Sequence, residues 1–516
     1  MTSTTRHFWA AYLDDLAYPS VSLAVVTSIL SWFLWVVING TYNLYLHPLS
    51  KFPGPKLAAF TIWWKIYVEL IQKKDLVEML FELHAVYGDV VRIAPNELHF
   101  AKPSVYHEIH SPRNRWSKDP VLYNAFAEFE SSFTIPEYHR AKKRKDILQP
   151  LFSRKSIISM QHLIQDCMDQ MCEGIAKQHG EGKSTNILLA FRCLAVDTIT
   201  SFCFAKPANA LAAPDFQAPI ERAMTLSLPM VTFIKYFPAI KTFVAHCPPL
   251  LVSLLKPGLI GLVNMRKTLW EQVLEVTKHP ETLESASHPI IYHALLNPVS
   301  GHEIPSFTSL RDEALLLVFA GTDTASNTLT LGTIHILSNP DIHKNVVREL
   351  LEAWPRLDDT PRYEALDSLP YLRAIVKESL RLVQGVVTPM TRVVPVEGAE
   401  LGGRHIPGGT VVGISNSFVL LDGSIFPDPH SFRPERWLEP SSESLDHWLV
   451  TFCKGPRSCL GVNLGYCELF LGFANLFRRF ELELDGVSAK SLRWKEAYLP
   501  HYEGPDLYVR AAPRSA

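Results

Sequence analysis

The chain begins with a long uninterrupted run of apolar residues. Between Val21 and Ile38 it has 18 residues without one charged side chain. A run of this length, extended by its flanking residues, can cross the hydrocarbon core of a bilayer as a helix. A cleaved signal peptide is the alternative, but its apolar core would be rather long, and no clear small-residue cleavage site follows Ile38. We therefore predict a transmembrane helix over residues 21–38, preceded by a short lumenal segment over residues 1–20.

A proline-rich segment follows the apolar run. Three prolines and one glycine fall within the stretch from His47 to Ala58, and such a composition cannot continue a helix. We expect a stiff hinge over residues 39–56. Two acidic residues precede the apolar run, whereas basic Lys51 and Lys56 follow it. This weak charge bias places the large C-terminal part of the chain in the cytosol.

Amphipathic patterns dominate the rest of the chain, and no comparable linker interrupts them. We expect one large domain over residues 57–516 that is mainly α with small β-sheets. Apolar residues at helical spacing predict long helices from Leu310 to Leu337 and from Leu464 to Phe480. Four short stretches bordered by Pro, Gly or Asn predict strands: Val90–Ile93, Glu97–Phe100, Arg392–Val396 and Thr410–Ile414.

The composition narrows the classes of protein to consider. The 516 residues include 50 basic and 52 acidic side chains, a formal net charge of −2, which argues against nucleic acid as a partner. Hydrophobic residues make up 47% and charged residues 20% of the chain, which excludes wholesale disorder. The eight cysteines are scattered without a CxxC pair or a zinc-type spacing. They fit reduced thiols in a cytosol-facing domain better than a disulfide framework or a structural zinc site.

One cysteine stands where a metal ligand would be activated. The segment Phe452–Gly461 places Cys459 in a Gly- and Pro-containing loop just before a predicted helix. The helix dipole and free N–H groups there stabilise a thiolate, and Gly455 and Gly461 would let the backbone approach the sulfur closely. With no histidine beside it, the other ligands of a metal would have to come from a macrocycle, and haem iron fits best. A buried structural cysteine in a turn is the alternative.

The same residues resemble the cytochrome P-450 family. Phe452, Gly455, Arg457, Cys459 and Gly461 match every fixed position of its haem-binding signature F-x-x-G-x-R-x-C-x-G. The resemblance implies haem b with Cys459 as the axial thiolate to the metal. It also implies that Arg457 pairs with a haem propionate and that Phe452 packs beside the sulfur.

A polar segment interrupts the long helix predicted over residues 310–337. Ala320–Thr324 reads A-G-T-D-T, and a glycine with three polar groups is a poor choice for a buried helix. In the resembled family this segment crosses the distal face of the haem, where the glycine opens space for dioxygen. The resemblance gives Thr324 and Asp323 catalytic roles in relaying protons. Hydroxyl groups that bond back to the preceding turn of a core helix are the structural alternative.

Two further motifs appear in the order that the family requires. Glu378 and Arg381 are spaced as helix neighbours, and the segment Phe432–Trp437 supplies Arg436. The resemblance implies a structural Glu-Arg-Arg network rather than a catalytic one, while an isolated pair would be a solvated ion pair. Arg392 matches a second arginine that pairs with a haem propionate. Its alternative is an exposed arginine at a strand start.

The basic run His139–Lys145 resembles the third helix of the family but departs from its pattern. Ala141 and Lys145 stand where many members have Trp and Arg. We expect Lys145 to substitute as a propionate partner. The other cations could dock an acidic reductase, or they could form a solvated helix face.

The resemblance implies a haem-thiolate monooxygenase that inserts one oxygen atom from dioxygen into a lipophilic small molecule. The expected partners are NADPH-cytochrome P-450 reductase, the substrate and the endoplasmic reticulum membrane, with the catalytic domain in the cytosol. The motif combination looks like that of a fungal secondary-metabolite enzyme. The expected substrate is a terpenoid or meroterpenoid, and in second place a polyketide. The expected pocket segments are apolar, including residues 116–133 and 225–263. Two alternatives stay open: a same-fold enzyme that rearranges or dehydrates its substrate without a reductase, and a non-catalytic haem-binding sensor.

Overall fold

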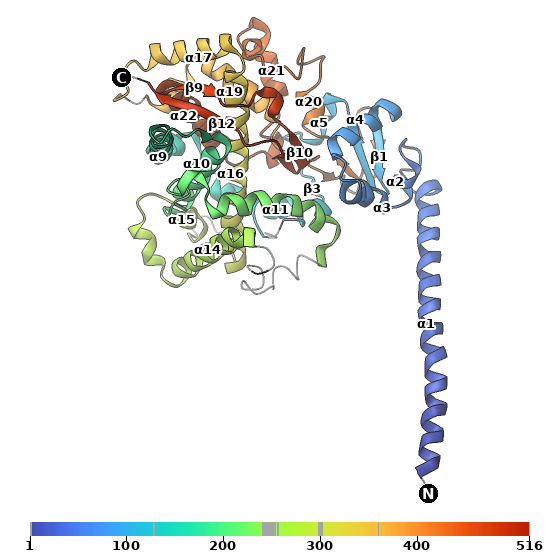
Figure 1. Ribbon diagram of the computed structural model, residues 1–516. Helices are drawn as coiled ribbons and strands as arrows, with labels where there is room; N and C mark the ends of the chain where they lie inside the picture. Colours follow the sequence, from blue (N-terminus) through green and yellow to red (C-terminus); the bar gives the residue numbers. More distant parts are fainter. Residues whose placement is uncertain are drawn as a thin grey trace.

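The computed structural model describes residues 3–126, 130–239, 254, 257–297, 303–359 and 361–514, with the backbone alone for residues 3–22. Parts of two expected pocket segments, residues 127–129 and most of residues 240–256, lie outside the described residues. The described chain forms a mostly helical domain with small sheets, from which one long helix projects (Figure 1). The mainly α prediction with small β-sheets is confirmed.

The helices of the described chain occupy most of the domain. Their bounds are α1 Ser3–Tyr45, α2 Lys56–Phe60, α3 Trp63–Ile66, α4 Leu76–Tyr87, α5 Pro103–Ile109, α6 Pro120–Tyr123, α7 Tyr138–Leu148, α8 Arg154–Ser159, α9 Gln161–Gly180, α10 Ile187–Phe204, α11 Pro219–Tyr236, α14 Ile260–Lys278, α15 Ile291–Leu295, α16 Phe307–Leu337, α17 Pro340–Ala353, α18 Tyr363–Asp367, α19 Pro370–Val383, α20 Ser417–Leu420, α21 Glu443–Trp448 and α22 Val462–Arg479. A π-helix, η1, covers Tyr67–Ile71.

Strands from distant parts of the chain form four small sheets. The strands are β1 Val90–Ala94, β2 Glu97–Phe100, β3 Ser117–Lys118, β4 Thr185–Asn186, β5 Arg392–Val393, β6 Ala399–Leu401, β7 Arg404–Ile406, β8 Val411–Gly413, β9 Phe480–Leu484, β10 Trp494–Ala497, β11 Leu499–Tyr502 and β12 Tyr508–Pro513. The largest sheet has the order β1-β2-β8-β5-β3, in which only the β2–β8 pair is parallel. The others are β10-β11, β4-β12-β9 and β6-β7.

The four predicted strands are present, but two are shorter than expected, since the strand predicted over Thr410–Ile414 covers only Val411–Gly413. We predicted a strand from Arg392 to Val396, and the structure pairs only Arg392 and Val393. Pro395 ends the ladder early because proline has no N–H to donate. The two predicted long helices are α16 and α22, within three residues of the expected bounds.

The N-terminal helix extends beyond the predicted span. The apolar and uncharged part of α1 runs from Leu23 to Tyr45, and 6% of it is buried within the protein. Figure 1 shows α1 pointing away from the domain, as expected of a membrane anchor. The prediction that the hinge begins at residue 39 is wrong, because helix continues to Tyr45 and the first helix-breaking proline is Pro48. Residues 46–55 form the non-helical connection.

Helix α16 is the central helix of the domain. It is buried along nearly its whole length, and α10 packs along it (Figure 1). Helix α10 is also apolar enough to cross a membrane, but 89% of it is buried in the protein. We therefore assign α10 to the core, and α1 is the candidate membrane span.

Candidate functional site

The loop that carries Cys459 is held in place by backbone contacts. The Cys459 N–H donates to the carbonyl of Phe452 at 2.9 Å, and the ring of Phe452 lies 5.2 Å from that of Tyr466 on α22. The ring of Phe452 thus packs on α22, and its expected place beside the sulfur stays a prediction. Gly455 has a φ of +71°, and a Cβ there would lie 2.3 Å from the carbonyl oxygen of His110. Glycine is therefore required at 455 by its positive φ and by the approach of His110, the residue that follows α5.

The Cys459 side chain is accessible although protein surrounds it. Its side chain is exposed, yet burial by neighbouring protein raises the pKa of its thiol, while the Gly461 N–H and the Lys145 ammonium oppose that rise. An exposed side chain enclosed in this way lies in a recess. In the described residues, no group of three His, Cys, Asp or Glu side chains could hold a metal ion.

One face of α16 is open in the middle of an otherwise buried helix. Ala320 and Thr324, four residues apart, are exposed, while Thr322 and Asp323 between them are buried. The Thr324 hydroxyl donates to the Ala320 carbonyl at 2.8 Å, so the expected alternative of back-bonding is present. The exposure distinguishes Thr324 from Thr322, which back-bonds to Val318 but is buried. Thr324 alone of the two can meet a molecule beside the helix.

Gly321 does not lie on this open face. A Cβ at Gly321 would come within 2.8 Å of the Ile199 side chain on α10. The absence of a side chain therefore lets α10 and α16 pack closely. The expectation that Gly321 opens space for dioxygen is wrong for this chain, since that side of the helix is filled by Ile199. The open space lies at Ala320 and Thr324 instead.

Arg392 has a second buried cation directly opposite it. The antiparallel pairing of β3 and β5 places Lys118 against Arg392, and both side chains are buried. Burial lowers the pKa of Lys118 well below its usual range, and Arg457 and Arg392 lower it further. Like charges opposite each other in a sheet are destabilising unless an anion lies between them. The sequence analysis missed Lys118, because only the strand pairing brings it to Arg392.

Arg457 belongs to the same group of cations. Its Nη2 donates to the carbonyl of Ile135 at 2.6 Å, while its Nη1 is buried without a hydrogen-bond partner. Burial and, to a smaller extent, the charge of Arg392 together lower the pKa of Arg457 to about 10. A buried guanidinium with an unused N–H is costly unless a ligand accepts from it.

Lys145 contacts the cysteine loop from α7. Its Nζ donates to the Ser458 carbonyl at 2.7 Å, and the Pro456 carbonyl and Ser458 Oγ are each 3.3 Å away. These contacts tie α7 to the residue next to Cys459. That Lys145 pairs with a propionate stays a prediction, while its hydrogen bonds in the structure position the loop.

The Glu-Arg-Arg motif forms the buried network that the sequence predicted. Glu378 accepts from Arg381 Nη2 at 2.8 Å and from Arg436 Nε at 3.2 Å, and Trp437 Nε1 donates to it at 2.8 Å. Arg381 in turn donates to the carbonyls of Leu420, Pro429 and Ser431. The network therefore joins α19 to the segment before the cysteine loop.

The ion-pair contact of Asp323 is with α10 and not with the cysteine loop. Asp323 Oδ1 is 3.4 Å from Arg192 Nε on α10. In the described residues, no hydrogen bond or ion pair joins Asp323 or Thr324 to residues 452–461. The structure thus connects Lys145 to the cysteine loop by hydrogen bonds and Arg392 to Arg457 of that loop by charge.

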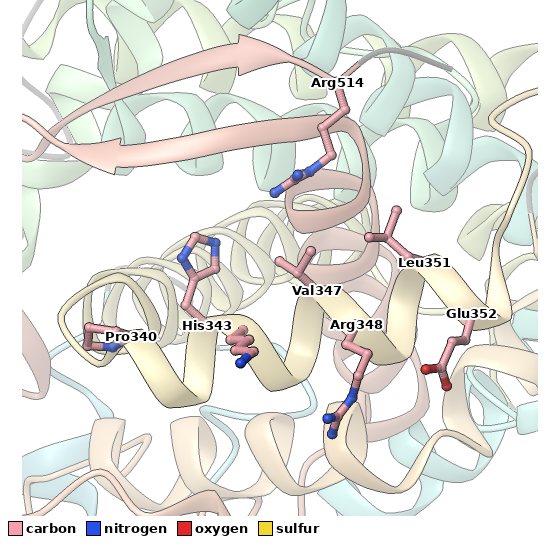
Figure 2. A pocket seen from close by; sticks show the side chains of 8 residues that line it. Pro340, His343, Val347, Arg348, Leu351, Glu352 and Arg514 are labelled. Carbon is pink, nitrogen blue, oxygen red and sulfur yellow. The ribbon is translucent and has the colours of Figure 1, made fainter.

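A groove elsewhere on the surface involves none of these residues. It has a volume of about 550 Å³ and lies between α17 and Arg514 near the C-terminus. Figure 2 shows His343 and Val347 rising from α17 toward Arg514. None of the predicted site residues lines it, so it is separate from the candidate site.

The residues present fit a haem group. An accessible Cys459 could supply a thiolate, and the buried Lys118 and Arg392 together with the half-buried Arg457 are cations that could meet the two carboxylates of a haem edge. The unpartnered Arg457 Nη1 supports the same match.

Comparisons with known proteins agree with this fit. The model of the cytochrome P450 family matches residues 53–500. The chain is 35% identical over 504 residues to cytochrome P450 monooxygenase flvC of Aspergillus flavus, covering 90% of this chain and 92% of that protein. It is 30% identical to monooxygenase macH of Penicillium terrestre, covering 92% and 97%, and 32% identical to monooxygenase BOT1 of Botryotinia fuckeliana, covering 93% and 94%. The family implies haem iron bound by a cysteine thiolate. From the family match and these relatives, the chain belongs to the cytochrome P450 family and is an oxidoreductase of its monooxygenase class.

Proposed function

We propose that Cys459 supplies the axial thiolate to haem b. When bound there, haem would activate dioxygen with electrons from a reductase and insert one oxygen atom into the substrate. The observation that carries this proposal is the group of buried cations beside the cysteine loop. Arg392 and Arg457 would each hold a carboxylate of the haem, and Lys118, which lies opposite Arg392, would be a third cation beside them.

Thr324 and Asp323 serve the proton supply in this proposal. The Thr324 hydroxyl is exposed on the open face of α16, where its oxygen can accept from a molecule beside the helix, and where it would donate to that molecule after leaving the Ala320 carbonyl. Asp323 is buried and ionisable, so it can hold a proton on the protein side. Thr324 and Asp323 are adjacent in sequence but differ in exposure. The exposed Thr324 would therefore deliver protons, and the buried Asp323 would supply them.

Apolar side chains of the expected pocket segments gather in one cluster, which suits a lipophilic substrate. Leu122, Tyr123, Leu228 and Tyr498 belong to a separate apolar cluster against which Phe126, Phe133 and Val386 pack. The rings of Phe126 and Tyr498 lie 4.7 Å apart. Aromatic and aliphatic side chains from α6, α11 and the β10-β11 sheet favour binding through buried apolar area. The proposed substrate is a terpenoid or meroterpenoid, and in second place a polyketide, of a fungal secondary-metabolite pathway. The fungal relatives support this setting.

The surface around the anchor supports a membrane location. After α1, the side chains of Leu57, Trp63 and Ile71 are 64%, 56% and 68% exposed, and the Trp63 ring lies 6.3 Å from that of Phe237 at the end of α11. Exposed apolar side chains next to a membrane helix suit the lipid surface. We place the protein in the endoplasmic reticulum membrane, with the catalytic domain in the cytosol and the substrate arriving from the lipid.

The exposed cations of α7 are the proposed contact for NADPH-cytochrome P450 reductase. The helix divides the basic run: Arg140 and Lys143 are exposed, whereas Arg144 and Lys145 turn inward. Arg144 lies 3.5 Å from the buried Glu313. The outward cations lie on the helix that also contacts the cysteine loop, so a docked acidic partner would be close to the haem.

The function is tested with the haem-loaded full chain, purified reductase and candidate lipophilic intermediates. NADPH consumed, peroxide released and product formed are measured in one reaction. Thr324→Ala should keep NADPH consumption but divert part of it to peroxide, whereas Asp323→Asn should slow turnover more than it wastes electrons. Product formation without NADPH and reductase would favour the rearranging enzyme instead. Absence of any product or consumption across the candidates would favour the haem-binding sensor.

A further inference from the structure

The groove between α17 and the C-terminal segment is lined mainly by cations. His343, Lys344 and Arg348 come from α17, and Arg514 follows β12 on the opposite side. Among the described residues that line the groove, Glu352 alone is acidic. Figure 2 shows Arg348 and Glu352 leaving the helix on the side away from Arg514. Glu352 therefore does not offset the charge at the end of the groove where His343 and Arg514 face each other.

His343 and Arg514 each hold a nitrogen atom that the protein does not use. Figure 2 shows the Arg514 side chain pointing toward His343. His343 Nε2 and Arg514 Nε are buried, and neither has a hydrogen-bond partner among the described residues. The ion pair of Arg514 is with Glu481 at 3.3 Å, and the Glu481 side chain is 69% exposed, so this pair contributes little. This end of the groove thus has donors to spare.

A further cation lies near this end of the groove. Arg478 on α22 is 2% exposed. It donates to two backbone carbonyls just after α17, while its Nη1 is buried without a partner among the described residues. Burial lowers the pKa of Arg478, and the charge of Arg514 lowers it further. The same two causes lower the pKa of His343. Positive charges held this close repel one another, and an anion in the groove would relieve that repulsion.

An apolar strip continues along α17 from the cationic end. Val347 and Leu351 follow His343 at intervals of four residues, which places all three on one face of the helix. Figure 2 shows them rising on the same side, and Leu351 is 40% exposed. The groove volume of about 550 Å³ is typical of a site for a small molecule. A ligand with a charged head and an apolar body would match these two parts.

The position of the groove argues against a lipid headgroup as the ligand. Figure 1 shows α17 and the C-terminus on the side of the domain away from α1. Because α1 is the candidate membrane span, the groove opens toward water and would take a soluble molecule.

We propose that the groove binds a soluble organic phosphate. The phosphate lies between His343, Lys344 and Arg514, and a small rotation of the partly exposed His343 and Arg514 side chains turns their unused nitrogen atoms to it. The apolar body lies on Val347 and Leu351. A phosphate directs its terminal oxygens to several sides, which suits donors from a helix and from the C-terminal segment, whereas the two oxygens of a carboxylate lie in one plane. This site is independent of the cysteine loop and of the proposed function.

Isothermal titration calorimetry of the haem-loaded full chain tests the proposal with phenyl phosphate, inorganic phosphate and benzoate as probes. Phenyl phosphate should bind most tightly, because inorganic phosphate lacks the apolar body and benzoate has a planar anion. The Soret band should not move, since the probe stays away from the haem. The proposal is overturned if millimolar phenyl phosphate gives no heat of binding, if benzoate binds as tightly, or if a Soret shift follows the heat.

Substitutions in the groove separate the charged head from the apolar body. Arg514→Gln removes a charge-assisted contact and should weaken both phosphates about tenfold. Lys344→Gln should weaken both by about threefold, because Lys344 is exposed. Leu351→Gln should weaken phenyl phosphate alone. Arg510→Gln is the matched control, since Arg510 lies on β12 but pairs with Asp485 at 3.0 Å outside the groove.

A folding defect in one variant does not remove the test. If Arg514→Gln lowers the thermal unfolding midpoint, Lys344→Gln and Leu351→Gln decide, because both side chains are exposed. Wild-type affinity for phenyl phosphate in both of these variants would overturn the proposal. An equal loss of affinity in Arg510→Gln would also overturn it, since the phosphate would then follow the overall surface charge rather than this groove.

Discussion

Lys118 and Arg392 are Cα partners in the antiparallel pair of β3 and β5, and both are buried. The Lys118 ammonium is also 4.0 Å from the centre of the Tyr123 ring and donates to the Phe133 carbonyl at 2.6 Å. These neutral contacts do not cancel the repulsion between two like charges. The pair is best explained as part of a site for the carboxylates of haem.

Lys118→Met should therefore weaken haem binding. Removing one charge-assisted contact in a buried site costs about 1.5–3 kcal/mol, which is roughly a tenfold or greater acceleration of haem loss. Lys118→Arg keeps the charge and should lose haem at a rate closer to wild type. Transfer of haem to excess apomyoglobin measures the rate. Equal rates for Lys118→Met and wild type would remove Lys118 from the haem site.

Glu378→Gln should destabilise the fold strongly. It leaves Arg381 and Arg436 buried without their shared carboxylate, and such a loss costs about 3–5 kcal/mol. The neighbouring pair Lys377–Asp446 is partly exposed, so Lys377→Gln is the matched control and should cost at most about 1 kcal/mol. Urea unfolding compares the two. Similar losses would mean that the network does not hold the core.

His335 should make the protein lose stability in mild acid. Its ring stacks on Phe432 at 5.1 Å, and burial lowers its pKa from 6.5 to about 4. Below pH 6.5 the unfolded chain takes up a proton that the folded protein does not, so stability falls as the pH drops toward 4 and not further below it. The loss is on the order of 2–3 kcal/mol.

His335→Gln should flatten this part of the pH profile, measured as the unfolding midpoint between pH 7 and pH 4. His162 is exposed, so His162→Gln is the control and should leave the profile unchanged. An unaltered profile in His335→Gln would show that other groups cause the acid loss.

Truncation of the anchor should depend sharply on where the chain is cut. Deletion through Ile38 removes most of the apolar helix but keeps Asn43, whose carbonyl accepts from the buried Arg92 at 2.8 Å. That variant should leave membranes and still bind haem. Deletion through Leu46 also removes the acceptor of Arg92 and should lower the unfolding midpoint as well. The measurements are membrane fractionation and thermal unfolding, and equal midpoints for both truncations would contradict the role of Asn43.

Local motifs in the sequence predicted the parts of the site that lie on one segment. The cysteine loop, α22 and the open polar segment of α16 follow from short-range spacing, since each is a single helix or turn. Lys118 and Arg192 could not be found in this way, because their partners come from other strands and helices. The role of Gly321 was misjudged for the same reason: only the packing of Ile199 against it shows which side of α16 is filled. The end of the anchor was misplaced because the segment Asn39–Tyr45 is polar enough to resemble a linker, although it lacks proline.

The central claim is that Cys459 binds the haem iron as a thiolate, and the spectrum of the reduced protein with carbon monoxide tests it most directly. Cys459→Ser should abolish the strongly red-shifted Soret band of this complex, because a hydroxyl cannot replace thiolate donation. Cys467→Ser is the matched control, since Cys467 is fully buried on α22, and it should keep the band. Retention of the red-shifted band in Cys459→Ser would contradict the account and move the ligand to another cysteine.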